Sequence, residues 1–287
     1  MQAAIIKDIQ LLSNPILDYI FIGITMMGSS YFYFLVLPIF YWCVDKRFGL
    51  KIGIILLSSI YVNTVVKNVT MVQRPIGYPG IRSIFTQSAG GYSFPSGHAQ
   101  GTTTFWGTLM FKYNRKCINI LGIASIILVS LSRLYLGVHW PVDIIGGILI
   151  AVLIIIVGEL VDSIIVESKF DIPLAYKIIL AIIVPTALII LFPYTENFEY
   201  MGLASGILIG YFIDGQYFGF TVTNTIKNQI YKIIIGVSIF LVLLSVLKNM
   251  LPYTNVFNAL RYFICGLWFS IGAPLTFNKF KLNKRTL

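Results

Sequence analysis

Long apolar segments separated by short polar turns run along most of this chain. A transmembrane helix needs about 20 consecutive apolar residues to cross the hydrocarbon core of a bilayer. By that measure the pattern predicts an all-α fold, a polytopic membrane helical bundle with ten spans. The predicted spans lie at approximately 15–28, 31–44, 50–69, 96–112, 118–137, 141–161, 174–193, 200–219, 230–250 and 256–276.

The first two apolar segments are short for full spans, because Gly28-Ser29-Ser30 interrupts the run. They could form two tilted spans in a tight hairpin or one long kinked helix, and we favour two spans. Ahead of them, residues 2–12 place Lys7, Asp8 and Gln10 among Ile and Leu residues, a pattern typical of a short helix that lies in the membrane interface.

Composition supports a membrane protein. Of the 287 residues 57% are hydrophobic and 11% are charged, whereas soluble domains carry about 25% charged residues. Cys43, Cys117 and Cys265 show no metal-ligand spacing. The net charge of +10 indicates loops that face an anionic membrane surface rather than a nucleic acid partner.

The placement of Lys and Arg predicts how the chain crosses the membrane, because cytoplasmic loops carry an excess of both. With ten spans and both termini in the cytoplasm, 15 basic residues fall on the inner side and 6 on the outer side. The mixed stretch 162–173 indicates a boundary, so we expect one domain over 1–165 and a second over 166–287. The sequence does not indicate an oligomeric state.

Three polar stretches fall on the predicted outer face. Their candidate functional residues are Lys67 and Arg74 in the first, Ser96, Gly97 and His98 in the second, and Arg133, His139 and Asp143 in the third. Pro95 suits the first turn of a helix, so the residues after it would lie at a helix N-terminus, where free N–H groups bind anions. His139 and Asp143 are four residues apart, which lets the carboxylate reach the imidazole.

Each stretch has an ordinary structural explanation by itself: snorkelling cations, a loop-to-helix junction and a structural His–Asp pair. Together they predict one phosphate site. Lys67, Arg74 and Arg133 would surround the phosphoryl oxygens, and Ser96 and the backbone of Gly97 would add neutral donors. His139 would be the nucleophile oriented by Asp143, and His98 the general acid. We expect no metal and no other cofactor, because three cations can hold the charge and no ligand cluster is present.

These motifs resemble the type 2 phosphatidic acid phosphatase (PAP2) superfamily, whose signature is K-x6-RP, PSGH and SR-x5-H-x3-D. The chain matches it at Lys67–Pro75, Pro95–His98 and Ser132–Asp143. The resemblance covers about residues 15–161 and implies a six-helix core that works as a metal-independent phosphatase. It further implies a phosphohistidine on His139 and a site on the extracytoplasmic face of the cell membrane. The Ile-, Lys- and Asn-rich composition resembles bacterial members. The four C-terminal spans lie outside this resemblance.

The expected substrate is a lipid phosphate or pyrophosphate whose tail stays in the bilayer. Undecaprenyl pyrophosphate, phosphatidylglycerol phosphate, phosphatidic acid and sphingoid phosphates are all compatible. A lipid phosphotransferase could use the same residues. A lipid transporter or binding protein is an alternative from another class, suggested by Asp214 and by the glycines at 202, 206 and 210. However, a carboxylate near the end of a span can simply be hydrated, and such glycine spacing more often means close helix packing.

Overall fold

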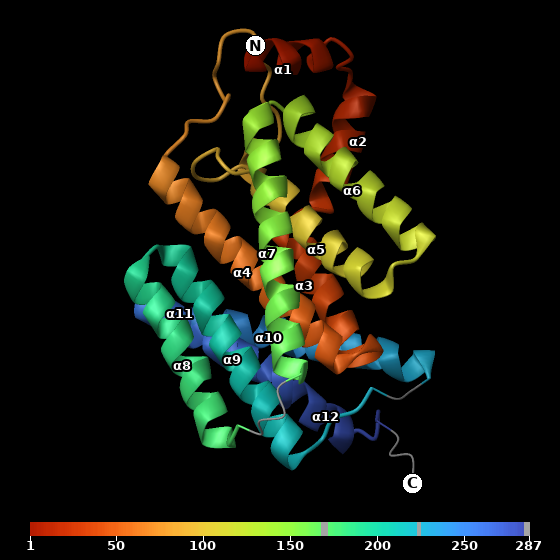
Figure 1. Ribbon diagram of the computed structural model, residues 1–287, viewed down its shortest axis with the longest axis vertical. Coiled ribbons are helices and arrows are strands. Elements are labelled where there is room, and N and C mark those ends of the chain that lie inside the picture. The colour runs from red at the N-terminus through yellow and green to blue at the C-terminus, as the bar shows by residue number, and fades with distance from the viewer. Residues whose placement is uncertain (168–171, 223–224, 284–287) are drawn as a thin grey trace. The chain divides into compact units, whose positions relative to one another are not determined.

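The computed structural model describes residues 1–167, 172–222 and 225–283, and these residues form helices joined by loops (Figure 1). The predicted all-α membrane fold is confirmed. Two parts of our sequence predictions fall outside the described residues. These are Lys169 and Asp171 of the expected boundary, and the final basic residues Lys284 and Arg285.

The first half of the chain forms a series of helices. They are α1 (Gln2–Gln10), α2 (Pro15–Met26), α3 (Ser30–Ile39), the π-helical η1 (Phe40–Val44), α4 (Lys46–Thr70), the short η2 (Thr86–Ser88), α5 (Gly97–Tyr113), α6 (Lys116–Tyr135) and α7 (Pro141–Glu167).

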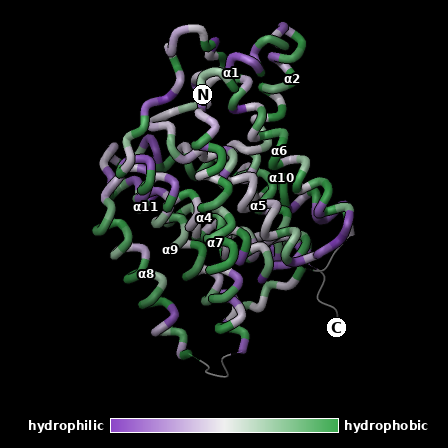
Figure 2. The backbone as a smooth tube through the Cα atoms, turned by 45° about the horizontal axis from the view of Figure 1, so that its top comes forward, coloured by the Kyte–Doolittle hydropathy of each residue, from purple (hydrophilic) through white to green (hydrophobic). Residues whose placement is uncertain are grey.

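The second half of the described chain continues with long helices. These are α8 (Leu174–Leu191), α9 (Thr195–Tyr217), α10 (Ile226–Met250), α11 (Asn255–Leu267), the π-helical η3 (Trp268–Gly272) and α12 (Ala273–Lys279). Figure 2 shows hydrophobic residues along most of α7 and α8, as expected for helices whose sides face lipid.

The chain folds into two compact units, one of residues 1–34 and 58–165 and the other of 35–57 and 166–287. We predicted domains at 1–165 and 166–287. The segment 35–57, which that prediction assigns to the first domain, lies in the second unit. Its aromatic side chains give the physical reason. The ring centroid of Tyr41 lies 4.8 Å from that of Phe269, and the centroid of Trp42 lies 5.4 Å from that of Phe277, so this segment packs into the core of the second unit.

Fewer helices qualify as membrane spans than we predicted. Within the described residues six helices are long and apolar enough, or seven if the bent pair α2 and α3 counts as one span. Two of the ten predicted spans, α5 and α9, are helices that do not meet this measure. Both are largely buried inside their own units, and the buried face of α5 is rich in Thr, so neither needs an apolar surface on every side.

The hairpin that we favoured for residues 15–44 is wrong. The helices α2 and α3 are bent by 47° at a break, whereas a hairpin would reverse the chain. The break occurs at Gly28, where a Cβ atom would lie 2.9 Å from the Thr102 hydroxyl oxygen of α5. The missing side chain therefore lets this segment pass close to α5.

The N-terminal helix α1 lies at the end of the first unit where α4 ends and α7 begins (Figure 1). The Gln10 side chain donates hydrogen bonds to the carbonyls of Arg82 at 2.7 Å and Tyr135 at 2.9 Å. The Gln2 side chain accepts one from the backbone N–H of Val142. Because residues 15–44 make no hairpin, the N-terminus lies on the same side as the loops predicted to hold the site. The cytoplasmic placement of both termini and the extracytoplasmic placement of the site stay predictions.

The glycines of α9 pack closely, as their spacing predicted. A Cβ atom at Gly202 or Gly206 would meet backbone atoms of α11. Asp214 is fully buried and forms an ion pair with Lys46, so it is not the hydrated carboxylate that we expected. This ion pair accounts for Asp214 within the fold and gives no support to a transport pathway.

Candidate active site

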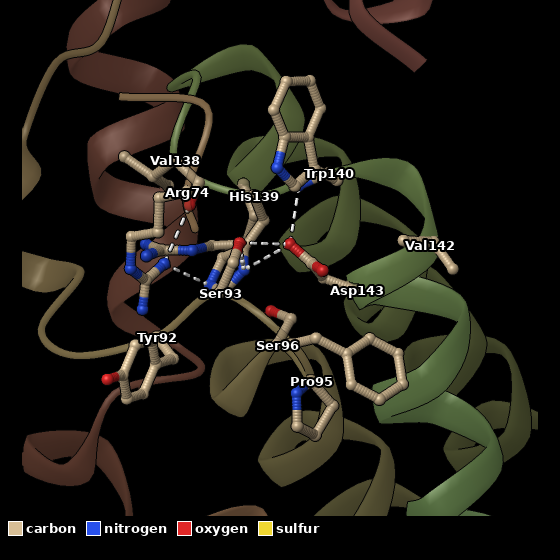
Figure 3. A network of polar contacts seen from close by, with 12 residues as sticks. Arg74, Tyr92, Ser93, Pro95, Ser96, Val138, His139, Trp140, Val142 and Asp143 are labelled. Atoms are coloured by element: carbon tan, nitrogen blue, oxygen red, sulfur yellow. Dashed lines mark hydrogen bonds and ion pairs between the residues drawn. The ribbon is translucent and has the colours of Figure 1, made fainter. Parts of the chain in front are cut away.

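The three predicted stretches meet at one end of the first unit, because each lies where a helix begins or ends. Lys67 is in the last turn of α4, the Pro95–His98 stretch leads into α5, and His139 precedes α7. Backbone contacts join the last two stretches: the Ser96 N–H donates to the Asp143 carbonyl at 2.9 Å. The helix termini thus bring residues separated by up to 76 positions into one site (Figure 3).

His139 and Asp143 form the centre of this site. The His139 ring is almost fully buried, and its Nδ1 lies 3.1 Å from Oδ2 of Asp143. The same carboxylate oxygen accepts hydrogen bonds from the backbone N–H of Trp140 at 2.7 Å and from the Ser93 hydroxyl at 2.5 Å. The carboxylate is therefore fixed from three directions, as Figure 3 shows.

Arg74 defines the tautomer of His139. Its Nη1 lies 2.9 Å from Nε2 of the ring, and a guanidinium can only donate hydrogen bonds. Nε2 therefore carries the lone pair, and Nδ1 carries the proton that it donates to Asp143. Burial lowers the pKa of His139 well below its usual value, and the neighbouring cations lower that pKa further. The ring is thus neutral, with the lone pair of Nε2 directed toward the cationic side of the site.

The cations are held by the chain that precedes α5. Arg74 donates from Nε to the Gly91 carbonyl at 2.9 Å and from Nη2 to the Gly90 carbonyl at 2.8 Å. Lys67 donates to the Tyr92 carbonyl at 2.5 Å. These carbonyl oxygens occupy positions around the cations where oxygens of an anionic ligand could also bind.

Arg133 is fully buried, and its partners are neutral groups. Its Nη1 donates to the hydroxyls of Thr25 at 2.9 Å and Ser88 at 3.0 Å, and its Nη2 donates to the Ser88 carbonyl. Among the described residues its Nε has no hydrogen-bond partner. A cation buried in this way needs polar partners, and within the described residues these hydroxyl and carbonyl groups provide them without a contacting carboxylate.

The turn before α5 differs in detail from our prediction. The helix begins at Gly97 with Ser96 as its N-cap, so Pro95 precedes the helix instead of opening it. A Cβ atom at Gly97 would lie 3.3 Å from Asn63 Oδ1, which leaves little space for a larger residue. His98 lies in the first helical turn, within electrostatic range of Lys67, Arg74 and Arg133.

Sequence reasoning missed several residues that shape the site: Thr25, Asn63, Ser88 and Ser93. Asn63 donates to the Pro95 carbonyl at 3.3 Å and to the Gln100 side chain at 2.7 Å, so it fixes the turn before α5. Its position in the middle of an apolar segment was a signal, because polar groups there need partners. Ser88 and Ser93 lie in a polar loop, where serine is too common to be informative.

The assembled groups can bind and attack a phosphoryl group. Three cations face one carboxylate, so the site has an excess of positive charge for an anion. The lone pair on Nε2 provides a nucleophile, and His98 is a second imidazole within electrostatic range of the same three cations. No three His, Cys, Asp or Glu side chains within the described ranges could hold a metal ion together, and independence from metal stays a prediction.

Comparison with known proteins finds relatives that act on lipid phosphates. The chain is 28% identical over 228 residues to lipid phosphate phosphatase delta of Arabidopsis thaliana, covering 72% of this chain and 53% of that protein. It is 34% identical over 152 residues to sphingosine-1-phosphate phosphatase 1 of Rattus norvegicus (50% and 35%). It is 36% identical over 102 residues to undecaprenyl-diphosphatase of Sulfolobus acidocaldarius (36% and 49%).

The chain thus spans about half or less of the length of these curated relatives. They come from a plant, a mammal and an archaeon, so the bacterial source stays a prediction. Residues 48–161 match the PAP2 superfamily, and residues 198–285 match the PAP2 superfamily phosphatase transmembrane extension. The C-terminal helices, about which the motifs said nothing, therefore also have counterparts in this family. The two matches cover most of the chain and contain the three motifs, and the chain belongs to the PAP2 superfamily.

Proposed function

We propose that this protein is a membrane phosphatase that hydrolyses a lipid phosphate or lipid pyrophosphate through a phosphohistidine on His139, without a metal. One observation carries the proposal: Nε2 of His139 has its lone pair directed at Arg74 while Nδ1 is anchored on Asp143. The names of the relatives support the substrate class, since they include lipid phosphate, sphingosine-1-phosphate and undecaprenyl-diphosphate phosphatases.

The first step transfers the phosphoryl group to the protein. As the substrate phosphate binds, its oxygens take over donors of Arg74, Lys67 and Arg133, and Nε2 is released from Arg74. Nε2 then attacks phosphorus, and the bond between phosphorus and the leaving oxygen breaks. The electron pair stays on the leaving oxygen, which receives a proton from His98.

The second step regenerates the protein. A water molecule attacks the phosphorus of the phosphohistidine, and His98, now neutral, accepts a proton from that water. The P–N bond breaks, its electron pair returns to Nε2, and inorganic phosphate leaves. Throughout both steps Asp143 balances the positive charge on the ring of His139 through the hydrogen bond to Nδ1.

We also propose that the site faces the extracytoplasmic side. At the opposite end of the first unit, the turn between α5 and α6 carries Lys112, Arg115 and Lys116. At the end of the first unit that holds the site, Asp18 neutralises Arg82 and accepts two hydrogen bonds from it at 2.7 and 2.8 Å. The other basic residues at this end, apart from Lys7, are the cations of the site itself. The positive-inside rule then places the α5–α6 turn in the cytoplasm.

An impermeant thiol reagent tests this orientation on intact cells. Cys117 is exposed near the α5–α6 turn, whereas Cys43 and Cys265 are buried. We expect Cys117 to stay unlabelled in intact cells and to react after the membrane is opened. A cysteine introduced at the exposed Gln87, with Cys117→Ser, should react without opening. The reverse pattern would place the site in the cytoplasm.

Phosphate release by the purified protein tests the function. A panel of lipid phosphates and pyrophosphates is assayed in detergent with EDTA and with no acceptor other than water. We expect release from at least one lipid, inhibition by vanadate, and no release by His139→Ala. Activity that EDTA removes and magnesium restores would contradict the metal-independent mechanism. Release only after an alcohol acceptor is added would indicate a phosphotransferase.

A further inference from the structure

Ser93 is a buried residue outside the three family motifs, and its hydroxyl lies at the centre of the site. The side chain is fully buried, and its Oγ donates to Oδ2 of Asp143 at 2.5 Å. This distance is shorter than those from the backbone N–H of Trp140 and from Nδ1 of His139 to the same oxygen. The Ser93 Oγ also lies 3.5 Å from Nδ1 of His139.

The backbone of Ser93 is fixed by the other parts of the site. Its N–H donates to the Val72 carbonyl at 2.7 Å, two residues before Arg74. Its carbonyl oxygen lies 3.5 Å from Nζ of Lys67. The hydroxyl is thus held in place by the segment that follows α4, while it contacts the first turn of α7.

We propose that Ser93 is a positioning residue that holds the Asp143 carboxylate, and through it the orientation of His139, for the proposed phosphoryl transfer. The other carboxylate oxygen, Oδ1, has no hydrogen-bond partner in the described part of the chain. Without Ser93 only the Trp140 N–H and His139 itself would hold Oδ2. The carboxylate could then rotate about its terminal bond, since that torsion has a broad energy minimum.

Loss of the Ser93 hydroxyl should also change the proton affinity of His139. A hydroxyl that donates to a carboxylate draws negative charge away from the bond to Nδ1. Its removal makes Asp143 a stronger partner for a protonated ring, so the pKa of His139 should rise. The charged and titratable groups that face this ring are Asp143 from α7, Lys67 from α4, Arg74 from the segment after α4, His98 from α5 and Arg133 from α6.

The test compares Ser93→Ala with Ser83→Ala. Ser83 belongs to the same loop, and its hydroxyl donates a hydrogen bond to the Gly137 carbonyl at 2.8 Å. Ser83→Ala is therefore a matched control, because it also removes one side-chain hydrogen bond of this loop. Selective ¹⁵N-histidine labelling reports the tautomer and titration of His139 without any substrate. The chain has two histidines, and a parallel His98→Gln sample assigns their signals.

We expect the wild-type protein and Ser83→Ala to show one tautomer, with the proton on Nδ1. In Ser93→Ala we expect the neutral ring to keep its proton on Nδ1, because Arg74 still donates to Nε2. We expect the titration midpoint of His139 to rise by about one pH unit, since a hydrogen bond to a charged group is worth roughly that much. With an active lipid substrate, kcat of Ser93→Ala should fall about 10- to 100-fold while KM changes by about twofold or less.

The proposal rests on the proposed function for its kinetic consequence, and the two can fail separately. A Ser93→Ala titration identical to that of the wild-type protein would overturn the role of Ser93, whatever the activity. The same would follow if Ser83→Ala shifted the titration equally, because any loop defect would then suffice. If the titration shifts as expected but the wild-type protein releases phosphate from no lipid, the positioning role stands and the proposed phosphatase function fails.

Discussion

Replacing Asp143 by Asn removes one charge from the site and leaves its shape almost unchanged. The amide can adopt two orientations. With its oxygen at the position of Oδ2, it keeps the hydrogen bonds from Trp140, Ser93 and His139, and its NH₂ group takes the position of the unpartnered Oδ1. With the NH₂ group at Oδ2, two donors would face each other at the 2.7 Å separation from the Trp140 nitrogen. The first orientation is therefore favoured.

This orientation decides the size of the effect. The proton of His139 stays on Nδ1, so the nucleophilic lone pair remains on Nε2. What is lost is the negative charge that balances the ring during phosphoryl transfer. Hydrogen bonds to charged groups contribute about 1.5–3 kcal/mol, which corresponds to a roughly 10- to 150-fold decrease in kcat. A wrong tautomer would cost far more, about 10⁴-fold in the Ser-His-Asp triad.

Rapid-quench measurement of phosphoenzyme formation separates these cases. The wild-type protein, Asp143→Asn and His139→Ala are compared on one lipid substrate. Their midpoints of thermal unfolding are measured first, to show that the three proteins are equally stable. We expect slow but measurable phosphoenzyme in Asp143→Asn and none in His139→Ala. A loss near 10⁴-fold would show that the amide and the ring have turned, which refutes the argument from the Trp140 donor. An unchanged rate would refute the charge-balancing role of Asp143.

Three further predictions follow from the same structure. His98→Ala should lower kcat about 10²–10⁴-fold on an alkyl phosphate and much less on p-nitrophenyl phosphate, whose leaving group needs no proton; equal losses on both would contradict its role as general acid. Because the pKa of His139 is lowered, the ring should stay neutral as the pH falls through its usual value near 6.5, and an NMR inflection at or above that pH in His98→Gln would contradict this. Gly206→Ala should lower the midpoint of thermal unfolding, because the added Cβ meets the Phe263 carbonyl of α11, whereas Gly215→Ala, with open space around it, should not.

The motifs predicted which residues form the site because their chemistry constrains their spacing. A spacing of four residues from His139 to Asp143 allows one helical turn to bring a carboxylate to an imidazole, and the structure has this contact. Spacing could not reveal that Ser93 reaches the same carboxylate, since that contact spans 50 residues and depends on the path of a loop.

The number of spans was harder to predict, because hydropathy reports the environment of a helix only when lipid surrounds it. The helix α5 buries Gln100, Thr104 and neighbouring polar residues against α4, where the Gln100 side chain bonds to the Ser59 carbonyl at 2.7 Å. Its length and apolarity therefore fall below those of a lipid-exposed span. Conversely, the break at Gly28 looks like a turn in the sequence, and only the packing against α5 shows that the chain continues forward.

The contacts of the cations bear on which phosphates fit the proposed function. In the structure, carbonyl oxygens of Gly90, Gly91 and Tyr92 already satisfy donors of Arg74 and Lys67. A ligand must therefore replace existing hydrogen bonds, and it gains only where its oxygens carry more charge than a carbonyl. A terminal phosphoryl group offers three such oxygens to the three cations, whereas a phosphodiester has two. Under the proposed function we therefore expect the site to favour lipid monophosphates and diphosphates over phosphodiester lipids.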